Sequence, residues 1–145
     1  MPKPSVFLDS SVIIAALLST RGGSFYILDE LKENFVFQTS EYGLREIQAV
    51  LKNKFIGEPG LLGQLFLLLG SAGVTILPTP SKRERRRFAK HISLNDAPIL
   101  ASAVEHSDYL LTLDNEFFKS EIVEMAKNRV LKILKPKEFI EIFRS

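Results

Sequence analysis

Cysteine is absent from this sequence of 145 residues, and histidine occurs only twice. Disulfide bonds and thiolate metal sites are therefore excluded, so a metal ion would have to be held by oxygen atoms or by the two histidines. The absence of cysteine also favours a cytoplasmic protein. His91 and His106 lie in unremarkable surroundings, and we expect neither of them to be a metal ligand.

Long apolar runs are missing as well, since none approaches the ~18 residues of a membrane span. Lys3 and the apolar residues 12–18 faintly resemble a signal peptide. However, Asp9 interrupts this stretch, and no small-residue cleavage pattern follows it. We therefore expect the N-terminal segment to form part of the fold.

The composition is ordinary for a globular protein, with 46% hydrophobic and 25% charged residues. The length suits a single domain, residues 1–145, that is large enough to bury a core. The net charge of +2 is too small to indicate a nucleic-acid partner by itself. Its distribution is uneven, because six of the nineteen lysines and arginines lie in "KRERRRFAKH", residues 82–91.

Short β-branched and aromatic runs alternate with longer segments of helical periodicity. Ser24 is a plausible N-cap, and Pro98 suits the first turn of a helix. The alternation predicts an α/β fold in which a central, mainly parallel five-stranded sheet is flanked by helices on both faces. Strands are expected at 5–9, 35–40, 74–78, 109–114 and 129–135, and helices at 12–19, 24–33, 41–54, 61–70, 82–91, 95–106, 120–127 and 136–145.

Four carboxylates stand out by their places in this pattern, since ligands bind outside the carboxyl ends of parallel strands. Asp9 ends the first expected strand and Asp114 the fourth, Asp96 opens a helix, and Glu46 lies on a half-apolar helix. Each has an ordinary explanation. Asp9 and Asp96 could be helix N-caps, Asp114 could form an Asx turn, and Glu46 could be a solvated charge.

Taken together, the four carboxylates predict a binding site for a cation. Two carboxylates ~4 Å apart repel each other by about 4 kcal/mol at an effective dielectric constant near 20, so a converging set needs a strong counter-charge. A divalent cation or a basic side chain could supply it. All-oxygen ligands favour Mg²⁺ or Mn²⁺, and such ions support the hydrolysis of phosphodiesters.

Several segments resemble a PIN domain, the nuclease fold of many prokaryotic toxin–antitoxin toxins. They are "VFLDSSVIIAAL", "EYGLREIQAVL", "NDAPILASAVEHSDYLLTLDNEFF" and "ILKPKEFIEIF", and they span nearly the whole chain. The resemblance implies a Mg²⁺- or Mn²⁺-dependent endoribonuclease with one or two metal ions. It also implies an RNA substrate, a possible antitoxin partner and a toxin of a toxin–antitoxin system.

The resemblance assigns roles to individual residues. The four acidic positions of the family match Asp9, Glu46, Asp96 and Asp114, which would be both catalytic and metal-binding. Supporting positions match Ser10, Thr112 and Glu116. Two departures concern peripheral contacts, because Glu116 is one methylene longer than the more usual Asp and Ser11 stands where Asn is frequent. Glu41 is the substitute if Glu46 faces solvent.

Two further segments have alternative interpretations. The basic stretch is either a solvated helix face or a track for an RNA backbone, formed by Lys82, Arg83, Arg85, Arg86, Arg87 and Lys90. The segment 61–70 has Gln64 as its only strongly polar residue, and a helix that is apolar all round is either buried or covered by a partner. We favour a homodimer interface or a groove for an antitoxin segment over a place in the core alone.

Other functions are compatible with parts of this pattern. A non-catalytic PIN-like module for RNA binding or assembly would gain nothing from four mutually repelling carboxylates. An RNA-processing nuclease outside a toxin–antitoxin system would share the same site. A receiver domain needs an acidic pair near the first strand, and a haloacid-type phosphatase needs an Asp where Ser11 stands, so both fit poorly.

Overall fold

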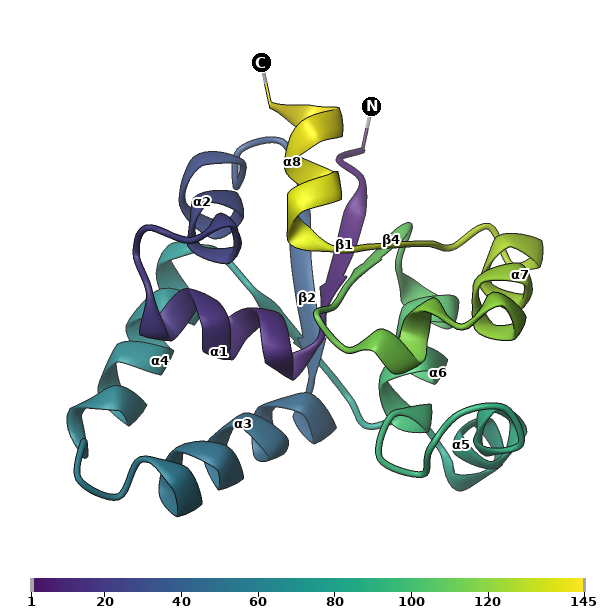
Figure 1. Cartoon of the computed structure of the whole chain (residues 1–145), viewed down its shortest axis with the longest axis horizontal. Helices are drawn as coiled ribbons and strands as arrows, with labels where there is room; N and C mark the ends of the chain where they lie inside the picture. Colours follow the sequence, from purple (N-terminus) through teal and green to yellow (C-terminus); the bar gives the residue numbers. More distant parts are fainter. Residues whose placement is uncertain (1, 145) are drawn as a thin grey trace.

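A five-stranded parallel sheet forms the centre of the computed structural model, which describes residues 2–144 (Figure 1). The strand order is β3-β2-β1-β4-β5, and every neighbouring pair is parallel, as the alternation of strands and helices predicted. The strands are β1 (Ser5–Leu8), β2 (Val36–Ser40), β3 (Thr75–Leu77), β4 (Tyr109–Leu111) and β5 (Lys132–Leu134).

Helices cover both faces of the sheet and enclose two hydrophobic clusters. One cluster lies under α1 (Ser10–Leu18), α2 (Gly23–Glu30), α3 (Glu41–Lys54), α4 (Gly60–Ser71) and α8 (Pro136–Phe143). The other lies under α5 (Lys82–Ala89), α6 (Ala97–His106), the 3₁₀ helix η1 (Asn115–Phe118) and α7 (Ser120–Asn128). Figure 1 shows α1, α2 and α4 on one side of the strands and α5, α6 and α7 on the other.

Strand β1 occupies the middle of the sheet and is buried on both faces. Val6 and Leu8 join the first cluster and Phe7 joins the second, because successive side chains of a strand point to opposite faces. None of the three has exposed surface. A continuous apolar run of this kind is typical of a central parallel strand. The residue that follows it, Asp9, is therefore the first polar side chain at the carboxyl edge of the sheet.

Some expected boundaries are wrong, and each has a local cause. Strand β4 ends at Leu111, and Asp114 caps the 3₁₀ helix η1, which was not expected. Strand β5 begins only at Lys132, because Val130 adopts a left-handed backbone conformation with φ of 61° between α7 and the strand. Helix α2 begins at Gly23 with Gly22 as its N-cap, so Ser24 lies inside the helix and is buried.

Helix α4 is buried on one face only. Leu61, Leu65 and Leu69, which are spaced four residues apart, pack into the core, whereas Leu62, Phe66 and Leu67 are exposed. A helix that is apolar on both faces thus leaves an apolar surface uncovered, as its composition predicted. No single helix in residues 2–144 is long and apolar enough to cross a membrane, although α1 and α2, at 93° to each other, pass that test as a bent pair.

Candidate active site

Asp9 lies at the turn from β1 into α1 and is only 4% exposed. Its Oδ1 accepts a hydrogen bond from the Ser10 backbone N–H at 2.9 Å. Its Oδ2 accepts bonds from Ser11 Oγ at 2.8 Å and from Thr112 Oγ1 at 2.7 Å. Asp9 is the N-cap of α1, which was one interpretation of this residue. The cap bond helps to hold the carboxylate in one orientation.

The same network joins the segment after β1 to the segment after β4. Ser11 Oγ accepts a bond from the Leu113 N–H at 3.1 Å, and Thr112 Oγ1 accepts one from the Asp114 N–H at 3.0 Å. Thr112 is completely buried, and its position next to Asp9 agrees with the supporting role expected of it. Because β1 and β4 are adjacent parallel strands, both carboxylates lie at the same edge of the sheet.

Asp114 and Glu116 occupy the start of η1. Asp114 Oδ1 accepts a hydrogen bond from the Glu116 N–H at 2.9 Å, which is the Asx-type turn that was one interpretation of this residue. The Glu116 carboxylate pairs with Lys119 Nζ at 2.7 Å. Glu116 is thus directed to a neighbouring lysine, and it does not line the groove formed by the other acidic residues.

Asp96 stands at the N-cap position of α6 but makes no side-chain capping bond. Its Oδ2 accepts a hydrogen bond from Ser93 Oγ at 3.0 Å, and its own N–H donates to the same Ser93 oxygen at 3.2 Å. Asp96 is therefore the N-cap of α6 by position, as one interpretation held, but its side chain does not make the capping bond. Burial, and next the negative charge of Asp114, raise the pKa of Asp96 to about 6.

Glu46 faces the other three carboxylates from the middle of α3. This helix begins at Glu41 because Ser40 Oγ caps it, accepting a 3.0 Å bond from the Gly43 N–H. Burial, and next the charges of Asp9, Asp96 and Asp114, raise the pKa of Glu46 to about 7. Glu46 is half-buried whereas Glu41 is exposed, so Glu41 is not needed as a substitute.

A groove of about 740 Å³ collects the four predicted carboxylates. Asp9, Glu46, Asp96 and Asp114 come from four segments that are far apart in the sequence, and all of them line it. Lys54 also lines this groove, but no ion pair in residues 2–144 involves any of the four carboxylates. Burial raises the pKa of Asp9 too, and none of the described basic side chains is paired with a groove carboxylate.

The donor set of the groove suits a hard divalent cation. All its acidic ligand atoms are oxygens, and the described residues bring no histidine into the groove. Within residues 2–144, no three acidic or histidine side chains are close enough to form a ready-made metal cage. Mg²⁺ does not need such a cage, because it binds one or two carboxylates directly and keeps several of its waters.

Sequence reasoning missed several residues of this region, above all Tyr42 and Ser93. Tyr42 precedes Glu46 by one helical turn on α3, and burial followed by the charges of Glu46 and Asp96 raises its pKa. The signal available was the spacing of four residues between Tyr42 and Glu46. Ser93 was marked only by its position three residues before Asp96.

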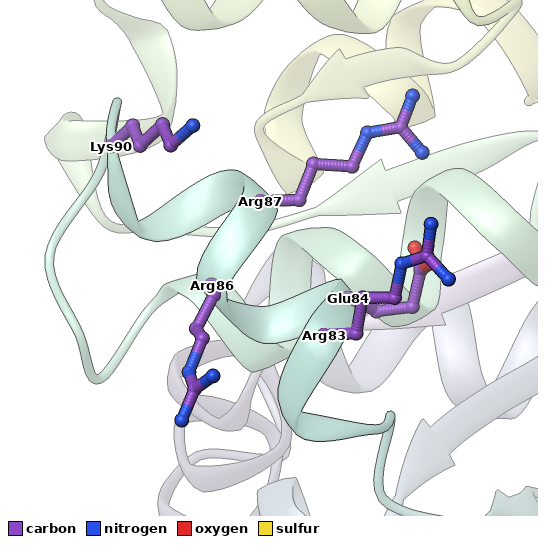
Figure 2. A pocket seen from close by; sticks show the side chains of 5 residues that line it. All are labelled: Arg83, Glu84, Arg86, Arg87 and Lys90. Carbon is purple, nitrogen blue, oxygen red and sulfur yellow. The ribbon is translucent and has the colours of Figure 1, made fainter.

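Helix α5 carries the basic stretch beside this site. In Figure 2 the side chains of Arg83, Arg86, Arg87 and Lys90 leave the helix in different directions, around a shallow cavity of about 510 Å³. Arg85 is different, because it is half-buried and its electrostatic effect reaches Tyr42. Most cations of the basic stretch therefore lie on an exposed surface, whereas Arg85 lies nearer to the carboxylates.

The sequence profile of the PIN domain family matches residues 6–121, a stretch that includes all four groove carboxylates. The chain belongs to the PIN domain family. PIN domains are nucleases, which agrees with an acidic groove at the carboxyl edge of the sheet. None of the curated proteins compared with this PIN domain matches it.

Solved structures confirm the fold. VapBC2 from Rickettsia felis, bound to a DNA fragment from its promoter, is 19% identical with a TM-score of 0.66, over 90% of this PIN domain and 98% of that chain. PAE2754 from Pyrobaculum aerophilum is 15% identical with a TM-score of 0.66, over 96% of this PIN domain and 94% of that chain. FitAcB from Neisseria gonorrhoeae is 22% identical with a TM-score of 0.57, over 91% of this PIN domain and 98% of that chain.

Proposed function

We propose that this PIN domain is a Mg²⁺- or Mn²⁺-dependent endoribonuclease that hydrolyses phosphodiester bonds of RNA. One observation carries the proposal: four carboxylates from separate segments line one groove, and no basic side chain among residues 2–144 is paired with them. Three of these carboxylates have raised pKa values, first through burial and then through their mutual repulsion. Such an arrangement is stabilised by a bound cation.

Asp9, Asp96 and Asp114 would hold the ion, directly or through water, and Glu46 would complete the site for one or two ions. When bound, the ion supplies activation of water and neutralises negative charge on the phosphate. The chain itself orients the carboxylates of the groove. Three hydrogen bonds fix the Asp9 carboxylate, and two bonds join Asp96 to Ser93. The Glu46 carboxylate would position the attacking water.

The cations of α5 would attract the RNA backbone, since phosphate contacts supply most of the affinity that does not depend on sequence. These residues are Lys82, Arg83, Arg85, Arg86, Arg87 and Lys90. Their helix packs against α6, whose N-terminal end carries Asp96. RNA drawn to α5 therefore comes close to the acidic groove.

We also propose that the protein is a cytoplasmic toxin of a toxin–antitoxin system, inhibited by an antitoxin protein. The support is the family and the resemblance of its motifs to those of such toxins. We assign the exposed face of α4, with Leu62, Phe66 and Leu67, to a homodimer interface, because large apolar side chains gathered on one helix face favour association.

RNA cleavage in EDTA, in Mg²⁺ and in Mn²⁺ tests the nuclease activity. We expect cleavage only with the metal ions, and its loss in Asp9→Asn and in Asp96→Asn. Asp29→Asn is the control, because Asp29 is an exposed acidic residue on α2 and lies outside the groove. Activity that survives chelation, or that survives either groove substitution, would exclude a carboxylate-held metal as the centre of the reaction.

A further inference from the structure

The acidic groove extends outward from the edge of the sheet between α1 and α3, which pack against each other. Figure 1 shows both helices running away from the strands on the same side. Residues about one helical turn apart line the groove on each helix. They are Ser10, Ser11, Ile14, Ala15 and Leu18 on α1, and Glu46, Val50 and Lys54 on α3. The groove therefore has an inner end at the carboxylates and an outer end at the last turns of the two helices.

The chemistry of the wall changes along the groove. Its inner end has the four carboxylates, its middle is apolar at Ile14 and Val50, and its outer end has Leu18, Phe55 and Lys54. Among residues 2–144, Lys54 is the only basic side chain that lines the groove. It is exposed, and none of the ion pairs between those residues involves it. The groove thus combines an end that suits a metal cation with an end that carries a positive charge.

The place of Lys54 on α3 has a simpler explanation, which covers it only in part. A lysine in the last turn of a helix is favourable wherever it points, because it interacts with the helix dipole. Lys52 lies in the same turn and has the same advantage. Residues two apart on a helix point to opposite sides, and Lys54 lines the groove whereas Lys52 does not. The dipole therefore does not explain why the charge of Lys54 faces the groove.

The distance between Lys54 and the carboxylates indicates what it contacts. Lys54 follows Glu46 by eight residues, which is about 12 Å along the axis of α3. The scissile phosphate would lie at the inner end, beside the proposed metal ion. RNA carries one phosphate for each nucleotide, so a strand lying in the groove places further phosphates towards the outer end. The separation favours a contact between Lys54 and a phosphate one or two nucleotides from the scissile one.

The surroundings of the groove agree with this path for the strand. The basic helix α5 packs against α6, whose N-terminal end carries Asp96. A strand that is drawn to α5 and crosses the carboxylates between α1 and α3 then reaches Lys54 at the end of α3. The aliphatic stem of a lysine commonly covers apolar surface, here next to Phe55, while its ammonium group stays in water. Lys54 can therefore present its charge to a phosphate above the apolar wall.

We propose that Lys54 binds a backbone phosphate of the RNA one or two nucleotides from the scissile phosphate, and so helps to set the register of the strand in the groove. This inference rests on the proposed ribonuclease activity and adds a substrate-binding residue to it. Because the contact is to phosphate, it does not depend on the base sequence. RNAs too short to reach Lys54 lack the contact and have a higher KM.

Cleavage of a short RNA that contains one neutral methylphosphonate linkage tests the contact. The product length shows where the cut falls, so each neutral linkage is placed relative to the scissile phosphate. In the wild type, neutralising the phosphate that Lys54 binds should raise KM about three- to tenfold, because one charge-assisted contact is lost. In Lys54→Ala, KM for the unmodified RNA should rise by the same factor, and the neutral linkage at that position should have no further effect. Additive effects at every linkage within two nucleotides of the cut overturn the proposal.

Lys52→Ala is the matched control, because it removes the same charge from the same turn of α3. It should leave KM, and the response of KM to each neutral linkage, as in the wild type. Lys54→Arg keeps a cation that binds phosphate and should restore most of the affinity. If Lys54→Ala and Lys52→Ala have equal KM values in a chain that cleaves RNA, the Lys54 proposal is wrong and the nuclease proposal stands.

Binding gives the readout when the wild type cleaves nothing. Fluorescence anisotropy with a labelled single-stranded RNA, at several salt concentrations, compares the wild type with Lys54→Ala and Lys52→Ala. Loss of one phosphate contact reduces the slope of log K against log salt concentration by about 0.7. A reduction in Lys54→Ala that is absent from Lys52→Ala supports the contact even though the nuclease proposal has failed, and equal slopes overturn it. Both lysines are exposed, so both variants should keep the thermal midpoint of the wild type.

Discussion

The hydroxyl group of Thr112 donates a 2.7 Å hydrogen bond to the Asp9 carboxylate across 103 residues of sequence. The same oxygen accepts a 3.0 Å bond from the N–H of Asp114, a second acidic residue of the groove. One buried hydroxyl thus positions two carboxylates relative to each other. Its two partners follow neighbouring parallel strands, β1 and β4, which explains how distant residues form one site.

Replacing Thr112 with valine should damage both stability and cleavage. Valine has a similar shape, but it removes one of the two side-chain donors to Asp9 Oδ2 and leaves the Asp114 N–H without its acceptor. We expect a loss of about 1–3 kcal/mol in the free energy of unfolding, measured by urea denaturation, and slower RNA cleavage. Thr112→Ser keeps the hydroxyl and should retain most of the activity. A valine variant as active as the serine variant would contradict this role.

The stability of the metal-free protein should fall as the pH rises. The pKa of Glu46 is about 7 in the folded protein against an ordinary value of 4.5, so the folded state binds more protons in this window. The free energy of unfolding therefore decreases between about pH 4.5 and pH 7, and Asp96 acts in the same direction up to about pH 6. Thermal unfolding in EDTA measures the effect.

Glu46→Gln provides the control for this pH dependence. Glutamine stays neutral at every pH, so the stability of the variant should decline less over the same window. Parallel curves for the wild type and Glu46→Gln would show that Glu46 does not cause the decline.

Divalent cations should stabilise the folded protein at neutral pH. A ligand that binds only the native state adds about 2.7 kcal/mol when its concentration is 100 times its Kd. We expect Mg²⁺ or Mn²⁺ to raise the thermal midpoint of the wild type and of Asp29→Asn, and to leave that of Asp9→Asn almost unchanged. Equal shifts in the three proteins would mean that the ion binds outside the groove.

Removing cations from α5 should weaken the salt dependence of RNA binding. For single strands, each phosphate contact contributes about −0.7 to the slope of log K against log salt concentration. Replacing Arg85, Arg86 and Arg87 with alanine should therefore reduce the slope by up to about 2. Alanine at the exposed Lys127, Arg129 and Lys132 removes the same charge elsewhere. An equal change in both triple variants would exclude α5 from the RNA footprint.

The exposed face of α4 gives a prediction about assembly. Phe66 is 49% exposed at the middle of this face, so Phe66→Glu places a charge in the proposed dimer interface. We expect a dimeric wild type and a monomeric variant in analytical ultracentrifugation. Gln64→Glu introduces a charge at an exposed polar position of the same helix and should remain dimeric. A monomeric wild type would contradict the assignment.

Much of the fold could be predicted from the sequence, because the spacing of apolar residues indicates which face of each helix or strand is buried. Helix α3 was predicted with its observed bounds, 41–54, since it combines a serine cap with a regular apolar stripe. The end of β4 was not predictable in the same way. Residues 112–114 have strand-like composition, but the hydrogen bonds that Thr112 and Leu113 donate to the distant Asp9 and Ser11 turn the chain there.

The candidate site, too, could be predicted from the sequence only in part. The acidic residues could be identified by their places after strands and on helices, and the structure brings those four together. The capping role of Asp9 was treated as an alternative to a place in the site, whereas one oxygen caps the helix and the other accepts two side-chain bonds. Tyr42 was missed because its only signal in the sequence was the spacing of four residues from Glu46.

The bond between Thr112 and Asp9 also links activity to the order of folding. The groove is complete only when β4 has paired with β1, which requires closing a loop of about 100 residues. Contacts so distant in sequence form slowly, whereas single helices form in about a microsecond. During refolding we therefore expect helical circular dichroism to return before RNA cleavage. A newly made chain would remain harmless to RNA until its last strands had joined the sheet.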